Sequence, residues 1–339
     1  MTSRAVSAVL FGVGVVAVVF AAGLAFVVGP RAAQLPYDLE PTQSIAEAPN
    51  ATFMQITDGA VAVNKGTLRS TIRVQADRKA TADLTGDLDG TAAVWLVGQE
   101  VVRTDNNERV SAYSTSLAVD RKTAAAQKWD GQWLDTSGNQ EAVDYSGQIY
   151  KFPFGTEKKD YQIFDRDVLG TQPAKFVKTE EIEGLETYQF TQEIREARQQ
   201  VPADRMQVLV GALAPGATSG EIVYDNTRTV WVEPTTGQFI KVQEVQHKNL
   251  LANNGVSVTI LDATFTYTDD TIKKSADTAS SNRQMLMLVK LWGPLVLLLI
   301  GILLIGGGLL LLRRRPAPQA AAPAEEPEEV SAGRHAGDS

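Results

Sequence analysis

Two long apolar segments near the ends of the chain enclose a middle section in which polar and apolar residues alternate. Residues 6–28 contain no charged residue, and 23 residues of helix are long enough to cross a ~30 Å hydrocarbon core. Residues 286–312 form the second segment, which is uncharged from Leu291 to Leu312. Both predict transmembrane helices. A cleaved signal peptide is the alternative for the first, with a small-residue site at residues 23–25.

Basic residues predict the orientation of the two helices. Arg313, Arg314 and Arg315 directly follow the second segment, and Arg4 precedes the first. Because basic residues gather on the cytoplasmic side, we expect a two-pass plasma-membrane protein with both termini in the cytoplasm and the middle section outside it.

These features divide the chain into six predicted parts. They are a short cytoplasmic N-terminus at 1–5, a transmembrane helix at 6–28, a linker at 29–58, an extracytoplasmic β-rich domain at 59–285, a transmembrane helix at 286–312 and a disordered cytoplasmic tail at 313–339. The tail is rich in Ala, Pro and Glu, a composition that cannot bury a core.

Small residues recur along both apolar segments. Gly14, Ala17 and Ala21 share one helical face of the first, and Gly301 and Gly308 lie seven residues apart in the second. Small side chains let helices approach closely, so the two helices are expected to pack together or against a partner's helices. The alternative is that Gly and Ala are simply common in such segments.

The middle section follows the pattern of half-buried strands. Between residues 67 and 76 apolar and small residues alternate with polar ones, the period of a strand with one buried face. The other predicted strands are 91–103, 109–120, 221–233, 238–248 and 256–267, with hairpin turns at 104–107 and 233–237 and a β-bulge near Leu261 and Asp262. The best helical stretch is 193–213, centred on Asp204 to Leu213 after a start at Pro202. The fold class is therefore mainly β, a large antiparallel β-rich domain with minor helix, flanked by two transmembrane α-helices.

Composition narrows the possible chemistry. The chain has no cysteine, which rules out disulfides, thiolate nucleophiles and cysteine-ligated metals. Its formal net charge of −8 is poorly suited to nucleic acid, so no nucleic-acid partner is expected. The membrane itself is the expected surroundings of the two helices.

The sequence offers no catalytic machinery. His247 is the one histidine of the middle section and lies in a predicted strand. There is no Gly-x-Ser-x-Gly turn and no glycine-rich phosphate loop. The acidic run from Asp83 to Asp89 has a partial calcium-loop pattern, but a plain acidic turn explains it better. We therefore expect no enzyme, no cofactor and no metal.

One aromatic segment stands out in the middle section. Tyr150, Phe152, Phe154, Tyr161 and Phe164 fall within fifteen residues and flank a Pro-Gly loop. They are the candidate contacts for a lipid or a protein partner, through an apolar groove or loop. The alternative is a loop that its aromatic side chains hold against the core.

Three stretches resemble the actinobacterial porin PorA-like family of two-pass envelope proteins. They are Tyr150–Gly155 with Tyr161–Asp165, Glu180–Phe190 and Trp231–Gly237. Mycobacterial relatives are linked to polar growth and to mycolate lipid trafficking with a large lipid exporter. The resemblance implies an outer domain that binds envelope lipid or assists a lipid-exporting membrane protein.

Three functions are consistent with these features. The leading hypothesis is a non-enzymatic envelope protein whose outer domain binds lipid. The second is a structural or scaffolding protein that recruits membrane partners. The third is a porin or channel, for which two uncharged helices would have to oligomerise.

Overall fold

The computed structural model describes residues 3–57, 59–136 and 138–313. The chain forms two compact units, a helical unit (Met1–Gly23 with Pro294–Ser339) and a β domain (Leu24–Gly293). Arg313 ends the last described helix. Arg314, Arg315 and the rest of the predicted disordered tail lie outside the described residues, as do residues 1 and 2 of the predicted cytoplasmic N-terminus.

The helical unit pairs helices α1 (Ser3–Gly23) and α6 (Gly293–Arg313). They belong to two helical runs, Arg4–Ala32 and Asp269–Arg313, that are long and apolar enough to cross a membrane. Both predicted membrane segments are thus found as long apolar helices.

Small residues form the contact between α1 and α6. Ser7, Gly14 and Ala21 are buried along α1 at seven-residue intervals, and Gly301 and Gly308 are buried along α6. A Cβ added to Gly301 would lie 2.9 Å from the Gly14 carbonyl oxygen, and one added to Gly308 would lie 3.0 Å from that of Ser7. The helices therefore run antiparallel and pack on each other, which is one of the two expected arrangements.

Replacing Gly301 by leucine is expected to push α1 and α6 apart. The added side chain would meet Val18 and the backbone of Gly14, so the helices would move toward the ~8–10 Å separation of helices that pack through large side chains. Because the chain has no cysteine, spin labels on Val19→Cys and Val296→Cys can measure this distance.

Gly306→Leu is the matched control for that measurement. A Cβ at Gly306 has nothing within 4 Å, so the same bulk in the same helix should leave the distance unchanged. Equal distances in the Gly301→Leu and Gly306→Leu variants would mean that the small residues do not set the separation.

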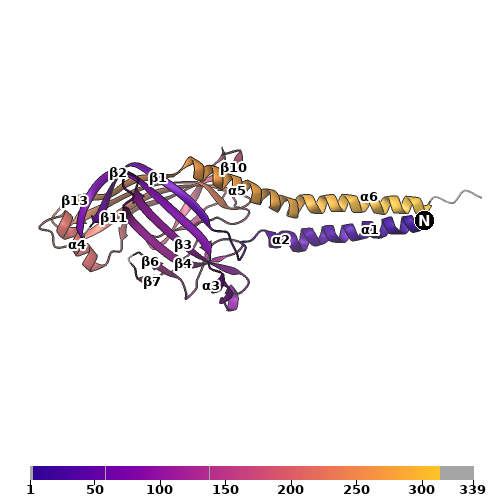
Figure 1. Ribbon diagram of the computed structural model, residues 1–339, viewed down its shortest axis with the longest axis horizontal. Coiled ribbons are helices and arrows are strands. Elements are labelled where there is room, and N and C mark those ends of the chain that lie inside the picture. Colours follow the sequence, from indigo (N-terminus) through magenta and orange to yellow (C-terminus); the bar gives the residue numbers. More distant parts are fainter. Residues whose placement is uncertain (1–2, 58, 137, 314–339) are drawn as a thin grey trace, which may run out of the picture. The chain divides into compact units, whose positions relative to one another are not determined.

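The β domain forms one antiparallel sheet, shown with the rest of the chain in Figure 1. Within the described residues the sheet has 13 strands in the order β7-β6-β4-β3-β2-β1-β13-β12-β11-β10-β9-β8, with β5 paired to β4. The strands are β1 (Thr42–Thr57), β2 (Ala60–Ala76), β3 (Ala92–Arg103), β4 (Arg109–Asp120), β5 (Ala126–Gln127), β6 (Trp133–Asp135), β7 (Gln140–Ala142), β8 (Tyr161–Asp165), β9 (Gly170–Ile182), β10 (Leu185–Gln199), β11 (Gly220–Glu233), β12 (Gln238–Ala252) and β13 (Ser257–Tyr267).

Short helices connect and flank these strands. They are the π-helical turns η1 (Leu24–Val28) and η3 (Leu288–Trp292), the 3₁₀ turn η2 (Gly86–Leu88), and α2 (Gly29–Ala32), α3 (Arg78–Ala82), α4 (Ala203–Leu213) and α5 (Asp269–Met287). Helix α5 packs its small residues Ala276 and Ala279 against Ile240 of β12. Helix α4 packs Leu209 and Val210 against strands β11 to β13.

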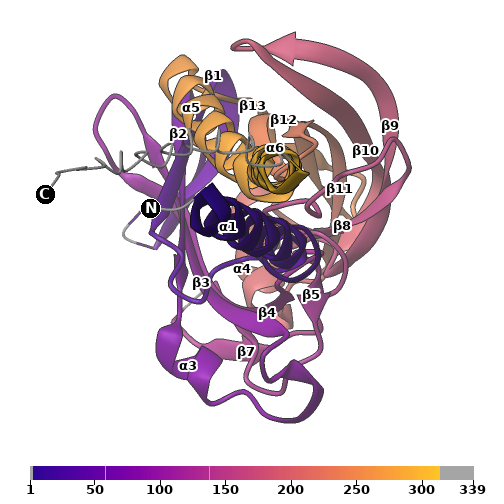
Figure 2. The same ribbon diagram turned by 90° about the vertical axis from the view of Figure 1, so that its right-hand side faces the viewer.

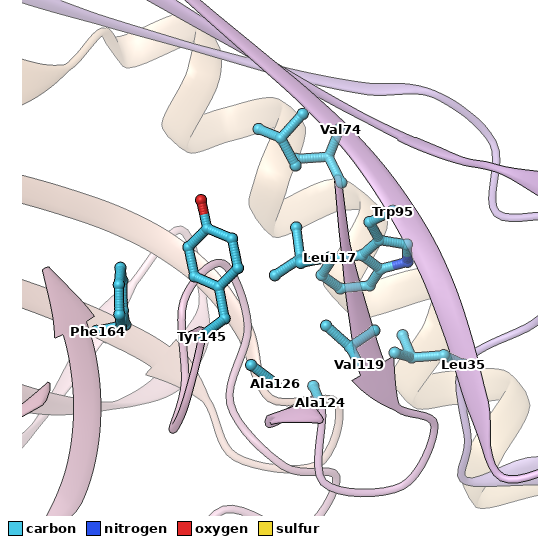
Figure 3. Close-up of a cluster of buried hydrophobic side chains, with 10 residues drawn as sticks. Leu35, Val74, Trp95, Leu117, Val119, Ala124, Ala126, Tyr145 and Phe164 are labelled. Atoms are coloured by element: carbon cyan, nitrogen blue, oxygen red, sulfur yellow. The ribbon is translucent and has the colours of Figure 1, made fainter. Parts of the chain in front are cut away.

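The sheet curls so that the segment after β7 meets β8, and Figure 2 shows the curl end-on. Gln148 bridges to Ile163, and the Tyr145 and Phe164 rings are 4.8 Å apart. Figure 3 shows how these two rings approach a cluster of buried side chains from β2, β3 and β4, including Trp95 and Leu117. The concave face of the sheet is therefore the inside of the domain.

The predicted hairpins are confirmed. Strands β3 and β4 pair from Ala92 with Asp120 to Val102 with Arg109, and β11 pairs with β12. The predicted bulge in the last strand lies at Ile260, because Lys248 pairs with Leu261 and Asn249 pairs with Thr259. The fold class, mainly antiparallel β between two long apolar helices, is confirmed.

Two segment predictions are wrong. Residues 42–57, placed in a linker, form β1 between β2 and β13. A bulge between Ala48 and Ala51 shifts which residues face inward, and this breaks the alternation that identifies a strand. Residues 193–199, placed at the start of a helix, belong to β10, which has a similar irregularity between Ile194 and Ala197. The predicted centre of that helix is confirmed as α4, which begins at Ala203 directly after Pro202.

Candidate functional site

A cavity of about 210 Å³ lies inside the curled sheet. Side chains from β1, β2, β3, β4, β8, β11, β12 and β13 line it, together with the segment that joins β7 to β8. Such a position in a curled sheet is a common place for a ligand site. The cavity is the candidate site of the β domain.

One part of the cavity wall is aromatic and aliphatic. Its apolar and phenolic residues are Leu68, Ile72, Val101, Val110, Tyr113, Tyr145, Ile149, Tyr150, Phe164, Val230, Phe239, Val242, Leu261, Phe265 and Tyr267. The hydroxyls of Tyr113 and Tyr150 form a hydrogen bond of 3.1 Å, and the Tyr145 hydroxyl is 2.7 Å from that of Thr115. Burial raises the pKa of Tyr145 to about 12, so this wall stays uncharged at neutral pH.

A network of charged side chains forms another part of the wall, and Arg228 is its centre. Its guanidinium donates to Asp165 at 3.0 Å, to Glu244 at 2.8 Å and to Gln192 Oε1 at 2.9 Å. Arg228 and Glu244 are direct cross-strand partners in β11 and β12. The Asp165 side chain is only 1% exposed, so Arg228 balances charge that water does not reach.

Lys248 balances the second buried carboxylate, Asp167. Lys248 Nζ donates to Asp167 Oδ1 at 2.7 Å, and Gln199 donates to the same oxygen at 2.9 Å. Burial acts to raise the pKa of Asp167, but Lys248 and Arg166 outweigh it and lower that pKa to about 2. Asp167 is therefore ionised at any physiological pH.

Arg166 is the third cation of the network. Its guanidinium lies 4.3 Å from the centre of the Tyr113 ring and 3.6 Å from Asp167 Oδ2. Among the described residues, its side-chain N–H groups make no hydrogen bond. Its side chain is 34% exposed, so these donors are accessible from the cavity.

The five predicted contact residues divide between the cavity and the core. Tyr150 and Phe164 line the cavity. Phe152 is fully buried, with its ring centre 4.7 Å from Tyr161 and 4.9 Å from Phe190. Phe154 is half-buried with Lys151 Nζ over its ring at 3.8 Å. The structure therefore brings two of the five to the candidate site.

The same aromatic segment is held by the predicted turn after β11. Phe152 N–H donates to the Gly237 carbonyl at 2.8 Å, and Thr156 N–H donates to that of Pro234 at 2.7 Å. The buried Glu233 carboxylate accepts from Thr236 N–H at 2.8 Å. Two of the stretches that support the family resemblance thus form one structural contact.

Other candidate groups lie away from the cavity. His247 Nδ1 is 3.0 Å from Asp262, and about half of each side chain is exposed. His247 is not among the residues that line the cavity. Within the described ranges, no group of three or more His, Asp or Glu residues is arranged to hold a metal ion.

Comparison with known proteins decides the family. A sequence profile described as Porin PorA matches residues 6–310, which is nearly the whole chain. The chain belongs to the Porin PorA family. A protein named Porin PorA from Corynebacterium resistens is 32% identical over 111 residues, which cover 29% of this chain and 26% of that protein. One of the same name from Corynebacterium amycolatum is 26% identical over 190 residues, covering 46% and 49% of the two chains.

Membership of the Porin PorA family indicates an envelope membrane protein, as the resemblance implied. The two apolar helices agree with a location in the membrane. This chain spans about half or less of the length of the two relatives that it matches.

The sequence prediction missed the charged network. Nothing in the sequence analysis groups Asp165, Arg166, Arg228, Glu244 and Lys248, because charged side chains in strands usually face water. The strand register decides which residues of β12 face the inside of the curled sheet, and the sequence does not reveal it. Glu244 and Lys248 lie on that inward face. Opposite charges at facing positions of β11 and β12 were the one available signal.

Proposed function

We propose that the β domain of this Porin PorA family protein is a non-enzymatic binding domain for a membrane amphiphile. The observation that carries this proposal is the cavity inside the sheet, which joins an aromatic and aliphatic wall to a charged network. An acyl segment suits the first part and a polar headgroup suits the second.

The size of the cavity limits the ligand. About 210 Å³ is below the ~300–1,000 Å³ of pockets that enclose a drug-sized ligand. The cavity therefore suits one acyl segment and part of a headgroup, and the remainder of a larger lipid would extend through the opening.

The topology is part of the same proposal. Arg313 at the end of α6, with Arg314 and Arg315 after it, supports a cytoplasmic C-terminal end under the positive-inside rule. The β domain then lies outside the plasma membrane, where it meets envelope lipids and can pass them to a lipid-exporting membrane protein.

Filling the cavity is expected to block binding. In Ser111→Phe the new ring would enter the cavity from β4, where Ser111 is exposed at its lining. We expect this variant to lose most of the photolabelling of β-domain peptides by diazirine-bearing dodecanol, with the full chain in lipid nanodiscs. Labelling of α6 peptides reports the amount of probe in the bilayer and normalises the signal.

Ala112→Phe is the matched control. Residues 111 and 112 face opposite sides of β4, and Ala112 does not line the cavity. Equal labelling in the wild-type protein and both variants would contradict the proposal, as would labelling confined to the helices.

A channel is the second candidate, and the name of the relatives favours it. In the part of α1 and α6 that the structure describes, small residues fill the interface, so one copy offers no charged or polar path there. Several copies would have to surround a pore. Stepwise conductance from purified protein in planar bilayers would support a channel.

A further inference from the structure

We propose that the cavity selects an amphiphile with an anionic headgroup, a carboxylate or a phosphate, and that Arg166 binds this group. The inference rests on the proposed amphiphile-binding function and specifies its ligand. It starts from the unequal pairing of the three cations that line the cavity.

Two of these cations already donate hydrogen bonds to carboxylates. Arg228 donates to two carboxylates and to Gln192, and Lys248 donates to Asp167. Among the described residues, Arg166 makes no side-chain hydrogen bond, and its nearest carboxylate oxygen is 3.6 Å away. It brings a full charge and five N–H donors to the cavity.

The shape of the donor group matches an anionic oxygen pair. A guanidinium binds a carboxylate or phosphate through two parallel hydrogen bonds, and such charge-assisted bonds are about twice as strong as neutral ones. The cation–π contact with Tyr113 limits the orientations that the Arg166 guanidinium must lose on binding. The site is therefore partly pre-organised.

The local charge balance also permits an anion. The network around Arg166 contains Asp165, Asp167 and Glu244 with Arg228 and Lys248. Burial raises the pKa of Asp165, although Arg228 opposes this shift. Arg228 is hydrogen-bonded to both Asp165 and Glu244, and Lys248 is hydrogen-bonded to Asp167. The three carboxylates and three cations balance, and Arg166 is the cation of the network whose N–H groups make no hydrogen bond to a carboxylate.

The aromatic wall begins next to this group. Arg166 lies over Tyr113, whose hydroxyl reaches Tyr150 at 3.1 Å. Tyr150 packs against the cluster that contains Tyr145 and Phe164. An anionic head on Arg166 would thus have an apolar surface beside it for the first part of its chain.

Matched probes test the headgroup. Diazirine-bearing dodecanoate, dodecyl phosphate and dodecanol share one chain, and each is presented to the full protein in nanodiscs at neutral pH. After normalisation to α6 peptides, we expect at least one of the anions to label the β domain about tenfold more than dodecanol does. The stronger of the two anions shows whether the site prefers a carboxylate or a phosphate.

Variants then test the assigned residue. Arg166→Gln should bring labelling by the anionic probes down to that of dodecanol in the same variant, and Arg166→Lys should keep part of the preference. Arg195→Gln is the control, since Arg195 is 57% exposed on β10 and does not line the cavity.

The outcomes separate the two proposals. Equal labelling by all three wild-type probes would overturn the anionic preference and leave amphiphile binding intact, whereas absence of β-domain labelling by any probe would overturn both. A preference that survives in a folded Arg166→Gln variant would overturn the role of Arg166. If Arg166→Gln does not fold, Arg166→Lys and the wild-type comparison still decide the question.

Discussion

Replacing Arg228 by methionine is expected to lower the free energy of unfolding of the β domain by about 3–5 kcal/mol, the usual cost of removing one partner from a buried ion pair. Methionine keeps much of the length of the side chain and removes its charge. Asp165, whose side chain is 1% exposed, and Glu244 would then remain inside the curled sheet without their shared cation. Near-ultraviolet circular dichroism of the full chain in detergent, followed during denaturant unfolding, measures the loss.

A control variant and a compensating variant test whether the loss comes from the buried charges. Arg195→Met breaks an ion pair of 3.6 Å whose two side chains are more than half exposed, and it should cost less than about 1 kcal/mol. Adding Asp165→Asn and Glu244→Gln to Arg228→Met should recover part of the loss, because the buried charges would disappear together. A loss below 1 kcal/mol in Arg228→Met would show that the network is solvated and does not support the cavity.

Replacing Gly237 by alanine is the second change with a large expected effect, about 3 kcal/mol of lost stability. Gly237 has a φ of +72°, and an added Cβ would overlap the carbonyl oxygens of Phe152 and Pro153. The turn after β11 would have to move away from the aromatic segment that it holds. Positive φ and steric overlap both act against the folded state.

Gly184 separates these two causes. It has nearly the same φ, +73°, and a Cβ there meets nothing within 4 Å. Gly184→Ala should therefore cost only the ~1–2 kcal/mol of a left-handed backbone. Thermal unfolding of both variants gives the difference, and equal losses would mean that the contact between Gly237 and the aromatic segment contributes little.

The sequence predicts the hairpins of this fold well because local rules determine them. The alternation in 67–76 and the turn residues at 104–107 and 233–237 each signal a strand or a turn within a few residues. The prediction fails where a bulge shifts the alternation, as between Ala48 and Ala51. It also fails for α5, because the buried Ala276 and Ala279 are too small to produce a strong apolar pattern.

The candidate site is harder to predict because it depends on register and curvature. The aromatic segment is visible in the sequence, but nothing local separates Tyr150, which lines the cavity, from Phe152, which fills the core. Arg166 and Arg228 are far apart in the chain and meet only when β8 and β11 lie in one curled sheet. The inner face of β12 carries polar residues, whereas the inward positions of a strand are usually apolar. The usual pattern therefore does not identify this face.

The stretches that carry the resemblance to the Porin PorA family are mainly structural in this chain. The Tyr150–Gly155 segment packs on the turn after β11, and Trp231 Nε1 donates to Glu180 at 3.0 Å. These contacts hold one side of the curled sheet together. The residues proposed to contact a ligand lie on neighbouring strands and in the Asp165–Asp167 turn.

Native mass spectrometry tests the central claim most directly. The full chain is taken from its own membranes in lipid nanodiscs, released in the spectrometer, and compared with Ser111→Phe and Ala112→Phe. The proposed function predicts one retained amphiphile on the wild-type chain and on Ala112→Phe, and a bare chain for Ser111→Phe. A bare wild-type chain, or the same retained lipid on all three proteins, would contradict the assignment of the cavity as the binding site.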